Sequence, residues 1–222
     1  QIKAEQPVYN DPPYEYRKPK TQQTNDDEGS DTNSDKDDVV SVKSSEQLEK
    51  LLNEANPYKL EYLGNESSPD FKGWDLDVAF VLGIGDNLLR EKIYKNIIKK
   101  GKKVISLINS TSSISSFALI GDGVFLNRNV IVNALSSIGN NVILNSGCII
   151  EHECEIDTAA HIAPGAVLAG NVKVGKRSFI GANSVIKQGV VIGDDVIIGA
   201  GSVVINNVES NSKIVGNPGR KI

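Results

Sequence analysis

The chain has 222 residues, enough for one sizeable domain or two small ones. Only 5% of its residues are aromatic while 20 are glycine, a composition that favours a thin, repetitive core over a large globular one. The net charge of −4 comes without a basic cluster, which argues against nucleic acid as a partner. The longest apolar run, residues 78–84, is too short to span a bilayer, and the first residues lack the pattern of a secretory signal. We therefore expect a cytoplasmic protein without membrane insertion.

Residues 1–37 are predicted to be a disordered or peripheral acidic tail. Several prolines interrupt its first half, and residues 21–38 carry no apolar side chain. Such a stretch cannot bury enough surface to offset the entropy lost on ordering. We interpret it as a solvated linker, with an acidic interaction tail as the alternative.

Residues 38–109 are predicted to form a small Rossmann-like α/β unit. Strands are expected at residues 39–42, 58–63, 78–84 and 104–108. One helix is expected at residues 45–55, with Ser44 or Ser45 as its N-cap. A second is expected at 88–100, with Leu89, Ile93 and Ile97 on one face and Gly101 as its stop. Because strands and helices alternate, we expect a small parallel sheet.

From Ile114 to Val204, every sixth residue is aliphatic, and the fourth residue after each is small or β-branched. Neither an α-helix nor a flat strand has this period. It is typical of a triangular coil in which three six-residue repeats, about 18 residues, complete one turn. The fold class is therefore mainly β, with a left-handed parallel β-helix of about five coils at residues 110–209. Residues 210–222 form a C-terminal extension in which Asn-Pro breaks the repeat.

The two cysteines, Cys148 and Cys154, both occupy the small-residue position of this repeat. Their separation of six residues places them on neighbouring faces of one coil. We interpret them as packing residues rather than as a nucleophile or a disulfide.

The two histidines, His152 and His161, both fall within the β-helix. His152 stands at an outward-facing corner, where other repeats carry Gly, Asn or Asp, and Gly170 follows about one coil later. A neutral imidazole can take a proton from an attacking amine or hydroxyl, and a backbone N–H can stabilise an oxyanion. These are two of the parts that acyl transfer requires, and Glu153 can hydrogen-bond the other ring nitrogen. The alternative is a surface histidine beside acidic neighbours.

His161 closes its repeat and either contacts a cofactor or is a solvated turn residue. A metal site of the γ-carbonic-anhydrase type, which uses the same helix, needs three histidine ligands. Two histidines cannot supply it, so we expect no metal.

Four segments of the chain carry a family resemblance, which covers about residues 75–222. They are Gly85–Tyr94 (GDNLLREKIY), Ile149–Cys154 (IIEHEC), Ala169–Gly175 (AGNVKVG) and Val215–Pro218 (VGNP). With them the chain resembles the hexapeptide-repeat acyltransferases. More narrowly, it is similar to the nucleotide-sugar N-acetyltransferases of the bacillosamine, perosamine and viosamine type and to their sialic-acid O-acetyltransferase relatives.

This resemblance implies a homotrimer with acetyl-CoA in the groove between neighbouring β-helices. His152 matches the family's catalytic base and Glu153 its partner. The sugar amine attacks acetyl-CoA directly, without an acyl-enzyme. The positions that match the family's cofactor contacts are His161 near the acetyl end, Gly170 facing the thioester carbonyl, and Ala182 and Ala200 through their backbones.

The N-terminal segment departs from the family's pattern. Such enzymes open with a strand and a Gly-rich loop that cradles the nucleotide diphosphate, whereas Lys43, Ser44 and Ser45 follow the strand at 39–42 without a glycine. The residues expected to bind the nucleotide-linked sugar, most often a UDP sugar, are Lys43, Ser44, Ser45, Gly85, Asp86 and Asn87. We expect acetylation of a nucleotide-linked 4-amino-4,6-dideoxy sugar, with a sugar O-acetyltransferase or a non-catalytic β-helix scaffold as alternatives.

Overall fold

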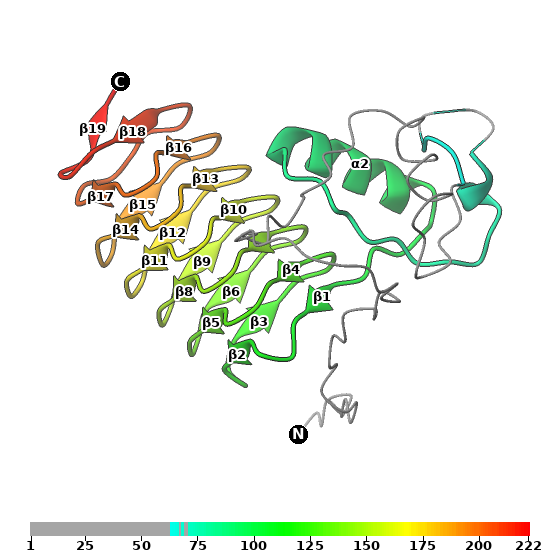
Figure 1. Cartoon of the computed structure of the whole chain (residues 1–222), viewed down its shortest axis with the longest axis horizontal. Coiled ribbons are helices and arrows are strands. Elements are labelled where there is room, and N and C mark those ends of the chain that lie inside the picture. The colour runs from blue at the N-terminus through cyan, green and yellow to red at the C-terminus, as the bar shows by residue number, and fades with distance from the viewer. Residues whose placement is uncertain (1–62, 67, 69–70) are drawn as a thin grey trace, which may run out of the picture. The chain divides into compact units, whose positions relative to one another are not determined.

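The computed structural model describes residues 63–66, 68 and 71–222 (Figure 1). The predicted tail, the helix at 45–55 and the strand at 39–42 lie outside these residues, as does all but the last residue of the strand at 58–63. The proposed binding residues Lys43, Ser44 and Ser45 lie outside them too. The Rossmann-like character of the N-terminal unit therefore stays a prediction.

Residues 107–215 wind into a parallel β-helix with three sheets, whose strands stack coil upon coil (Figure 1). The first sheet contains β1 (Leu107–Ile108), β4 (Phe125–Leu126), β7 (Ile143–Leu144), β10 (His161–Ile162), β13 (Phe179–Ile180), β16 (Ile197–Ile198), β18 (Lys213–Val215) and the antiparallel β19 (Arg220–Lys221). The second sheet contains β2 (Ser113–Ile114), β5 (Ile131–Val132), β8 (Ile149–Ile150), β11 (Val167–Leu168), β14 (Val185–Ile186) and β17 (Val203–Val204). The third sheet contains β3 (Leu119–Ile120), β6 (Ser137–Ile138), β9 (Glu155–Ile156), β12 (Lys173–Val174) and β15 (Val191–Ile192).

The second sheet contributes one strand to every coil, so its six strands count six coils. The prediction of about five coils was one too few. The repeat begins before Ile114, because β1 pairs in parallel with β4, and it continues after Val204, because β18 pairs with β16. Ile108 of β1 fits the six-residue pattern, whereas β18 pairs although the pattern has become irregular after Val204.

The predicted six-residue repeat sets the register of the sheets. Leu126 pairs with Leu144, and Leu144 pairs with Ile162, so each coil advances by 18 residues. These aliphatic side chains have no exposed surface, and they form one continuous core along the helix. The short strands suit such a column because each residue contacts only the coils directly before and after it.

Three corners join the sheets, and each uses a residue in the left-handed backbone region. We call the first corner the turn between the first and second sheets, the second corner that between the second and third, and the third corner that between the third and first. Asn and Gly occupy most of these left-handed positions, as the turn geometry favours. Leu135 and Glu153 at the second corner, with φ of 62° and 60°, are exceptions.

Both cysteines are free, and neither side chain is exposed to solvent. Burial raises the pKa of Cys148 to about 12 and also raises the pKa of Cys154. A buried thiol that resists ionisation is a poor nucleophile. The structure thus agrees with the packing role predicted for the two residues.

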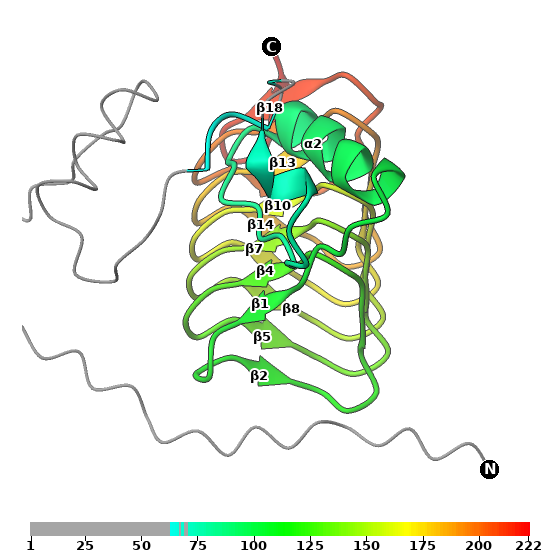
Figure 2. The ribbon, with the colours of Figure 1, turned by 90° about the vertical axis from the view of Figure 1, so that its right-hand side faces the viewer.

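The segment before the β-helix contains a short 3₁₀ helix, η1 (Lys72–Trp74), and the helix α2 (Asn87–Lys99). The prediction of a helix at 88–100 is confirmed to within one residue at each end. Asp86 caps its first turn by accepting a hydrogen bond from the Leu89 amide at 2.7 Å, and Gly101 follows its C-cap with φ of +72°. Figure 2 shows α2 against the first sheet, in front of β10 and β13.

The strands predicted at 78–84 and 104–108 are largely wrong. Only Phe80 and Val104 pair, in parallel, through hydrogen bonds from Phe80 N to Lys103 O and from Ile105 N to Phe80 O. The end of the second predicted strand, Leu107–Ile108, instead becomes β1 of the β-helix because its backbone pairs with β4. Within the part of the chain that the structure describes, no helix is long and apolar enough to cross a bilayer.

Candidate active site

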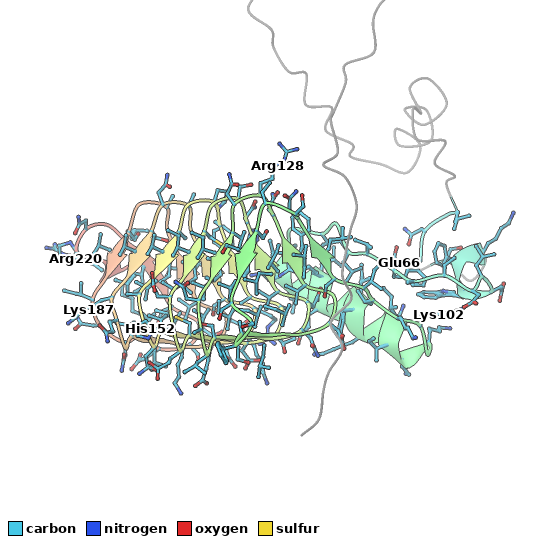
Figure 3. All side chains as sticks on the ribbon, turned by 90° about the horizontal axis from the view of Figure 1, so that it is seen from below. Glu66, Lys102, Arg128, His152, Lys187 and Arg220 are labelled. Atoms are coloured by element: carbon cyan, nitrogen blue, oxygen red, sulfur yellow. The ribbon has the colours of Figure 1, made fainter. Side chains whose placement is uncertain are left out.

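His152 lies at the second corner, between β8 and β9, on the surface of the coil (Figure 3). Its Nδ1 lies 3.0 Å from Oε2 of Glu153, and the two side chains are 52% and 57% exposed. The left-handed backbone at Glu153 turns this carboxylate back toward the preceding ring. A carboxylate at Nδ1 holds the proton on that nitrogen, which leaves the lone pair of Nε2 available to accept one.

Gly170 stands next to His152 on the following coil, as the sequence spacing predicts. A Cβ atom on Gly170 would lie 2.5 Å from Cε1 and 2.6 Å from Nε2 of His152. The amide of the next residue, Asn171, donates to the His152 carbonyl at 2.8 Å, which fixes the two corners against each other. Only glycine leaves room for the imidazole here, and in the described part of the chain nothing accepts a hydrogen bond from the Gly170 amide. A base and a backbone N–H without an acceptor therefore lie next to each other, with His152 exposed and Gly170 buried.

His161 lies in a different environment, on β10 of the first sheet. Its ring packs edge-to-face on Phe179, with centroids 5.0 Å apart, and its Nε2 lies 3.5 Å from the Asn145 amide nitrogen. Burial, followed by the charge of Arg90, lowers the pKa of His161 to about 4, although the Gly85 backbone acts in the opposite direction. The alternative of a solvated turn residue is therefore wrong. His161 is a neutral, half-buried strand residue whose Nδ1 is buried without a hydrogen bond.

His161 and Asn145 line a cavity of about 260 Å³. Its other walls are residues 81–85 and the apolar side chains of Leu107, Phe125 and Ile143. A second hollow of about 340 Å³ lies beside it, between Gly85–Leu88 and the outer side of β13 and β16. Of the predicted binding residues, Gly85 borders both depressions, and Asp86 and Asn87 border the second one. A hollow of about 730 Å³ along the third sheet is lined by no histidine.

Ala182 and Ala200 occupy the first corner, stacked one coil apart. The Gly201 amide donates to the Ala182 carbonyl at 2.8 Å, so this carbonyl already joins the two successive coils. The first corner is separate from the second corner, where His152 lies, and from the outer side of the first sheet, where His161 lies.

The predicted site residues that the structure describes thus form three separate groups, one of which is Ala182 and Ala200 at the first corner. His152, Glu153 and Gly170 share the second corner, whereas His161 and the Gly85–Asn87 loop meet on the first sheet. In a triangular coil the first sheet lies across from the second corner. One chain therefore does not bring His152 and His161 together.

Arg90 was not among the predicted site residues, yet it is 1% exposed and donates to several carbonyl oxygens. The predicted apolar face of its helix is also wrong in part. The buried residues of α2 are Arg90, Glu91 and Ile97, while Leu89 is 46% exposed. The only feature of the sequence that singled out Arg90 was its position in the segment 85–94, which carries part of the family resemblance.

Among the described residues, no three His, Cys, Asp or Glu side chains are grouped so that they could hold a metal ion.

Comparison with known proteins places this geometry among transferases. Residues 171–206 match the family described as bacterial transferase hexapeptide (six repeats). The perosamine N-acetyltransferase PerB from Caulobacter crescentus, solved with CoA and GDP-perosamine, is 34% identical with a TM-score of 0.63, over 64% of this chain and 69% of that one. The acetyltransferase domain of PglB from Neisseria gonorrhoeae, solved with acetyl coenzyme A, is 31% identical with a TM-score of 0.63, over 65% and 70%. WeeI from Acinetobacter baumannii is 28% identical with a TM-score of 0.63, over 65% and 70%.

Proposed function

Because the chain belongs to the hexapeptide-repeat acetyltransferases and is an acyltransferase, we propose that it acetylates the amino group of a nucleotide-linked 4-amino-4,6-dideoxy sugar, with acetyl-CoA as donor. The observation that carries this proposal is the imidazole of His152 against Gly170, with Glu153 at its Nδ1. Similar proteins bind CoA with GDP-perosamine, or acetyl coenzyme A, which supports both substrates. Both are cytosolic metabolites, so we place the reaction in the cytoplasm.

The proposed reaction needs no acyl-enzyme. Nε2 of His152 takes a proton from the sugar amine as its nitrogen attacks the thioester carbonyl carbon. The tetrahedral oxyanion accepts a hydrogen bond from the Gly170 amide. When the intermediate collapses, the C–S bond breaks, the amide product forms, and the CoA thiolate takes the proton held by His152. The raised pKa of both buried cysteines supports a direct transfer, since neither thiol is available as a nucleophile.

We propose that the acceptor binds along Gly85, Asp86 and Asn87, and that Lys43, Ser44 and Ser45 contact its phosphates. The hollows beside Gly85–Asn87 support the first half of this proposal. We expect the nucleotide to be UDP, and sugars linked to GDP or dTDP are the alternatives to be assayed beside it. Ala182 and Ala200 are proposed to contact CoA through their backbones.

We also propose a homotrimer of left-handed β-helices. An acetyl-CoA that reaches His152 and His161 at once must lie between two copies, because the two side chains are on opposite sides of one coil. The outer side of the second sheet carries a stripe of β-branched side chains that a neighbouring copy can cover: Ile131, Ile149, Val167, Val185 and Val203. Closed rotational symmetry would then give every copy the same contact.

The test is release of the CoA thiol from acetyl-CoA in the presence of UDP-, GDP- and dTDP-linked amino sugars. We expect turnover with at least one 4-amino sugar. His152→Ala should lower kcat by about 10²- to 10⁴-fold, the usual contribution of a general base. Gly170→Ala should lower it by about 10²-fold, because the added methyl displaces the ring from the reacting position.

Arg128→Ala is the matched control, since Arg128 is also an exposed corner residue, at the first corner. It should leave the rate unchanged, and all three variants should keep the thermal stability of the wild type. An unaltered rate in His152→Ala would remove the histidine from the mechanism. Turnover only with sugar alcohols would indicate an O-acetyltransferase, and no turnover with any amine or alcohol would favour a scaffold.

A further inference from the structure

Arg90 is buried without an ion pair. Its side chain is 1% exposed, and none of the ion pairs among the described residues includes it. A guanidinium has five N–H donors and no acceptor, so burial is tolerable only when oxygen atoms surround it. Here all of those oxygens are backbone carbonyls except Oδ1 of Asn87, and they belong to two separate segments of the chain.

The partners of Arg90 form two groups. On the loop before α2, Nη1 donates to the carbonyls of Ile84 and Gly85 at 3.0 and 3.2 Å, and Nη2 donates to Oδ1 of Asn87 at 2.9 Å. On the third corner of the β-helix, the partners are the carbonyls of Asn141 at 3.1 Å, Ala159 at 2.7 Å and Ala160 at 3.3 Å. One planar group therefore joins the loop to the coil.

Both groups of partners lead to the same cavity. Ile84 and Gly85 form one wall of the 260 Å³ cavity, and His161, which directly follows Ala160, forms part of the opposite wall. The position of one wall relative to the other thus depends on the Arg90 guanidinium. No other side chain among the described residues donates to both the Ile84–Asn87 loop and the corner at 159–160.

We propose that Arg90 is a positioning residue, which fixes the Gly85–Asn87 loop and His161 in one geometry so that the acceptor sugar meets the acetyl end of the cofactor correctly. This inference rests on the proposed acetyl transfer. Arg90 itself touches neither substrate and acts through the loop carbonyls and through the strand that bears His161.

The electrostatics support the same role. Arg90 is the charged side chain that acts on His161, whose pKa is about 4, and the carboxylate that acts on Arg90 is Asp86 at the N-cap of α2. The remaining side chains around the ring, Asn145 and Phe179, carry no charge. A neutral His161 can donate one hydrogen bond to the carbonyl oxygen of an uncharged acetyl group without bringing a second positive charge to the site.

The alternative is that Arg90 merely anchors the helix, a task for which Arg177 gives the comparison. Arg177 holds α2 through Glu91 at 3.2 Å and is itself paired with Asp195 at 2.6 Å. Its side chain contacts neither the Ile84 and Gly85 carbonyls nor His161 in the described structure. Loss of Arg177 should therefore loosen the helix and leave the cavity wall in place.

The experiment compares Arg90→Met, Arg90→Lys and Arg177→Met in the full chain. The readouts are the melting temperature, the separate KM values for acetyl-CoA and for the acceptor, and the NMR titration of the imidazole C–H signals. Only two histidines contribute such signals. Lys92→Met, an exposed change on the same helix, is the neutral control.

We expect Arg90→Met to raise the acceptor KM by about tenfold or more while the acetyl-CoA KM stays within about twofold, because the displaced loop then binds the acceptor less tightly. The pKa of His161 should rise above about 4, but only by the part that the Arg90 charge contributes, because burial is the larger cause and remains. Arg90→Lys, which keeps the charge but not the planar fork, should keep the pKa of His161 low and still raise the acceptor KM. Arg177→Met should lower the melting temperature without raising that pKa.

A folded Arg90→Met variant with the wild-type acceptor KM and the wild-type His161 titration would overturn the proposal. If Arg90→Met does not fold, Arg90→Lys decides, because an unchanged acceptor KM there contradicts the positioning role. The proposed function can fail separately: if the wild type shows no turnover, the His161 titration still reports whether Arg90 controls this wall.

Discussion

The two histidines have opposite surroundings, and the difference sets what each can do. His152 is half exposed and lies against the carboxylate of Glu153, which supports a base that accepts a proton during the reaction. His161 lies near the guanidinium of Arg90 in a largely apolar wall, where its protonated form is disfavoured. Of the two, His152 is therefore the one that we propose carries a proton between substrates.

The environment of His161 predicts a loss of stability in acid. In the unfolded chain the imidazole takes up its proton near pH 6.5, whereas in the folded protein it does so only near pH 4. Between these values the unfolded state binds more protons, so stability rises with pH across this window and falls as the solution is acidified. His161→Gln, which cannot be protonated, should flatten the dependence of melting temperature on pH between about 4 and 6.5.

Calorimetry of both proteins across this range provides the measurement. Glu91 and Asp195 have lowered pKa values and also cost stability in acid, but they do so equally in both proteins. The difference between the two curves therefore isolates His161. Parallel curves would show that the folded protein protonates this histidine as readily as the unfolded chain does.

The pairing of His152 with Gly170 was predictable because a strict repeat converts sequence distance into spatial distance. Arg90 was not predictable in this way. Its partners are carbonyl oxygens of residues 141, 159 and 160, and every residue type offers a carbonyl, so no sequence pattern marks the acceptors. Backbone partners far along the chain become visible only when the coil and the helix are both in place.

At the scale of elements, α2 links the loop at 85–87 to the β-helix. Its ends were predictable, since Asp86 and Gly101 are local signals. The face that α2 buries was not predictable, because the pattern of Leu89, Ile93 and Ile97 indicated an apolar contact. The helix instead packs on corners that present carbonyls, Arg177 and few apolar atoms, so Arg90 and Glu91 are buried there.

The cap of α2 gives a prediction at this scale. Asp86→Ala removes the acceptor of the Leu89 amide and should lower the free energy of unfolding by about 1 kcal/mol, within the usual range for a lost N-cap. Asp86→Asn keeps a capping oxygen and should lose much less. Denaturant unfolding of the three proteins measures this, and equal losses in both variants would mean that charge rather than capping matters at Asp86.

At the scale of the whole molecule, the repeat determines the β-helix because each coil needs only its neighbours. The sequence pattern therefore predicted the interior correctly from Leu126 to Val204. It missed β18, which pairs through backbone hydrogen bonds without a regular repeat, and β1, whose Ile108 fits the repeat but had been placed in a strand of the preceding unit. The pattern also says nothing of the outer side of each sheet, since outward residues vary from coil to coil.

The outward-facing side chains of the second and third sheets differ in their chemistry. Glu155 and Lys173 pair on the third sheet at 2.8 Å, as suits a solvated face. The second sheet presents β-branched side chains at the same strand position, and such a stripe is typical of a surface that another protein covers. If the proposed trimer forms through the second sheet, disrupting this stripe should separate the chains without unfolding the coil.

Val185 and Val191 allow a matched test of that statement. They occupy equivalent strand positions on the second and third sheets and are 40% and 41% exposed. Wild type and Val191→Asp should have the mass of a trimer by light scattering, about three times 23.9 kDa, whereas Val185→Asp should shift toward 23.9 kDa. Because His152 and His161 would then no longer meet across two copies, Val185→Asp should also lose acetyl transfer although both histidines remain. An active Val185→Asp monomer would place the whole reaction within one chain and refute the shared site.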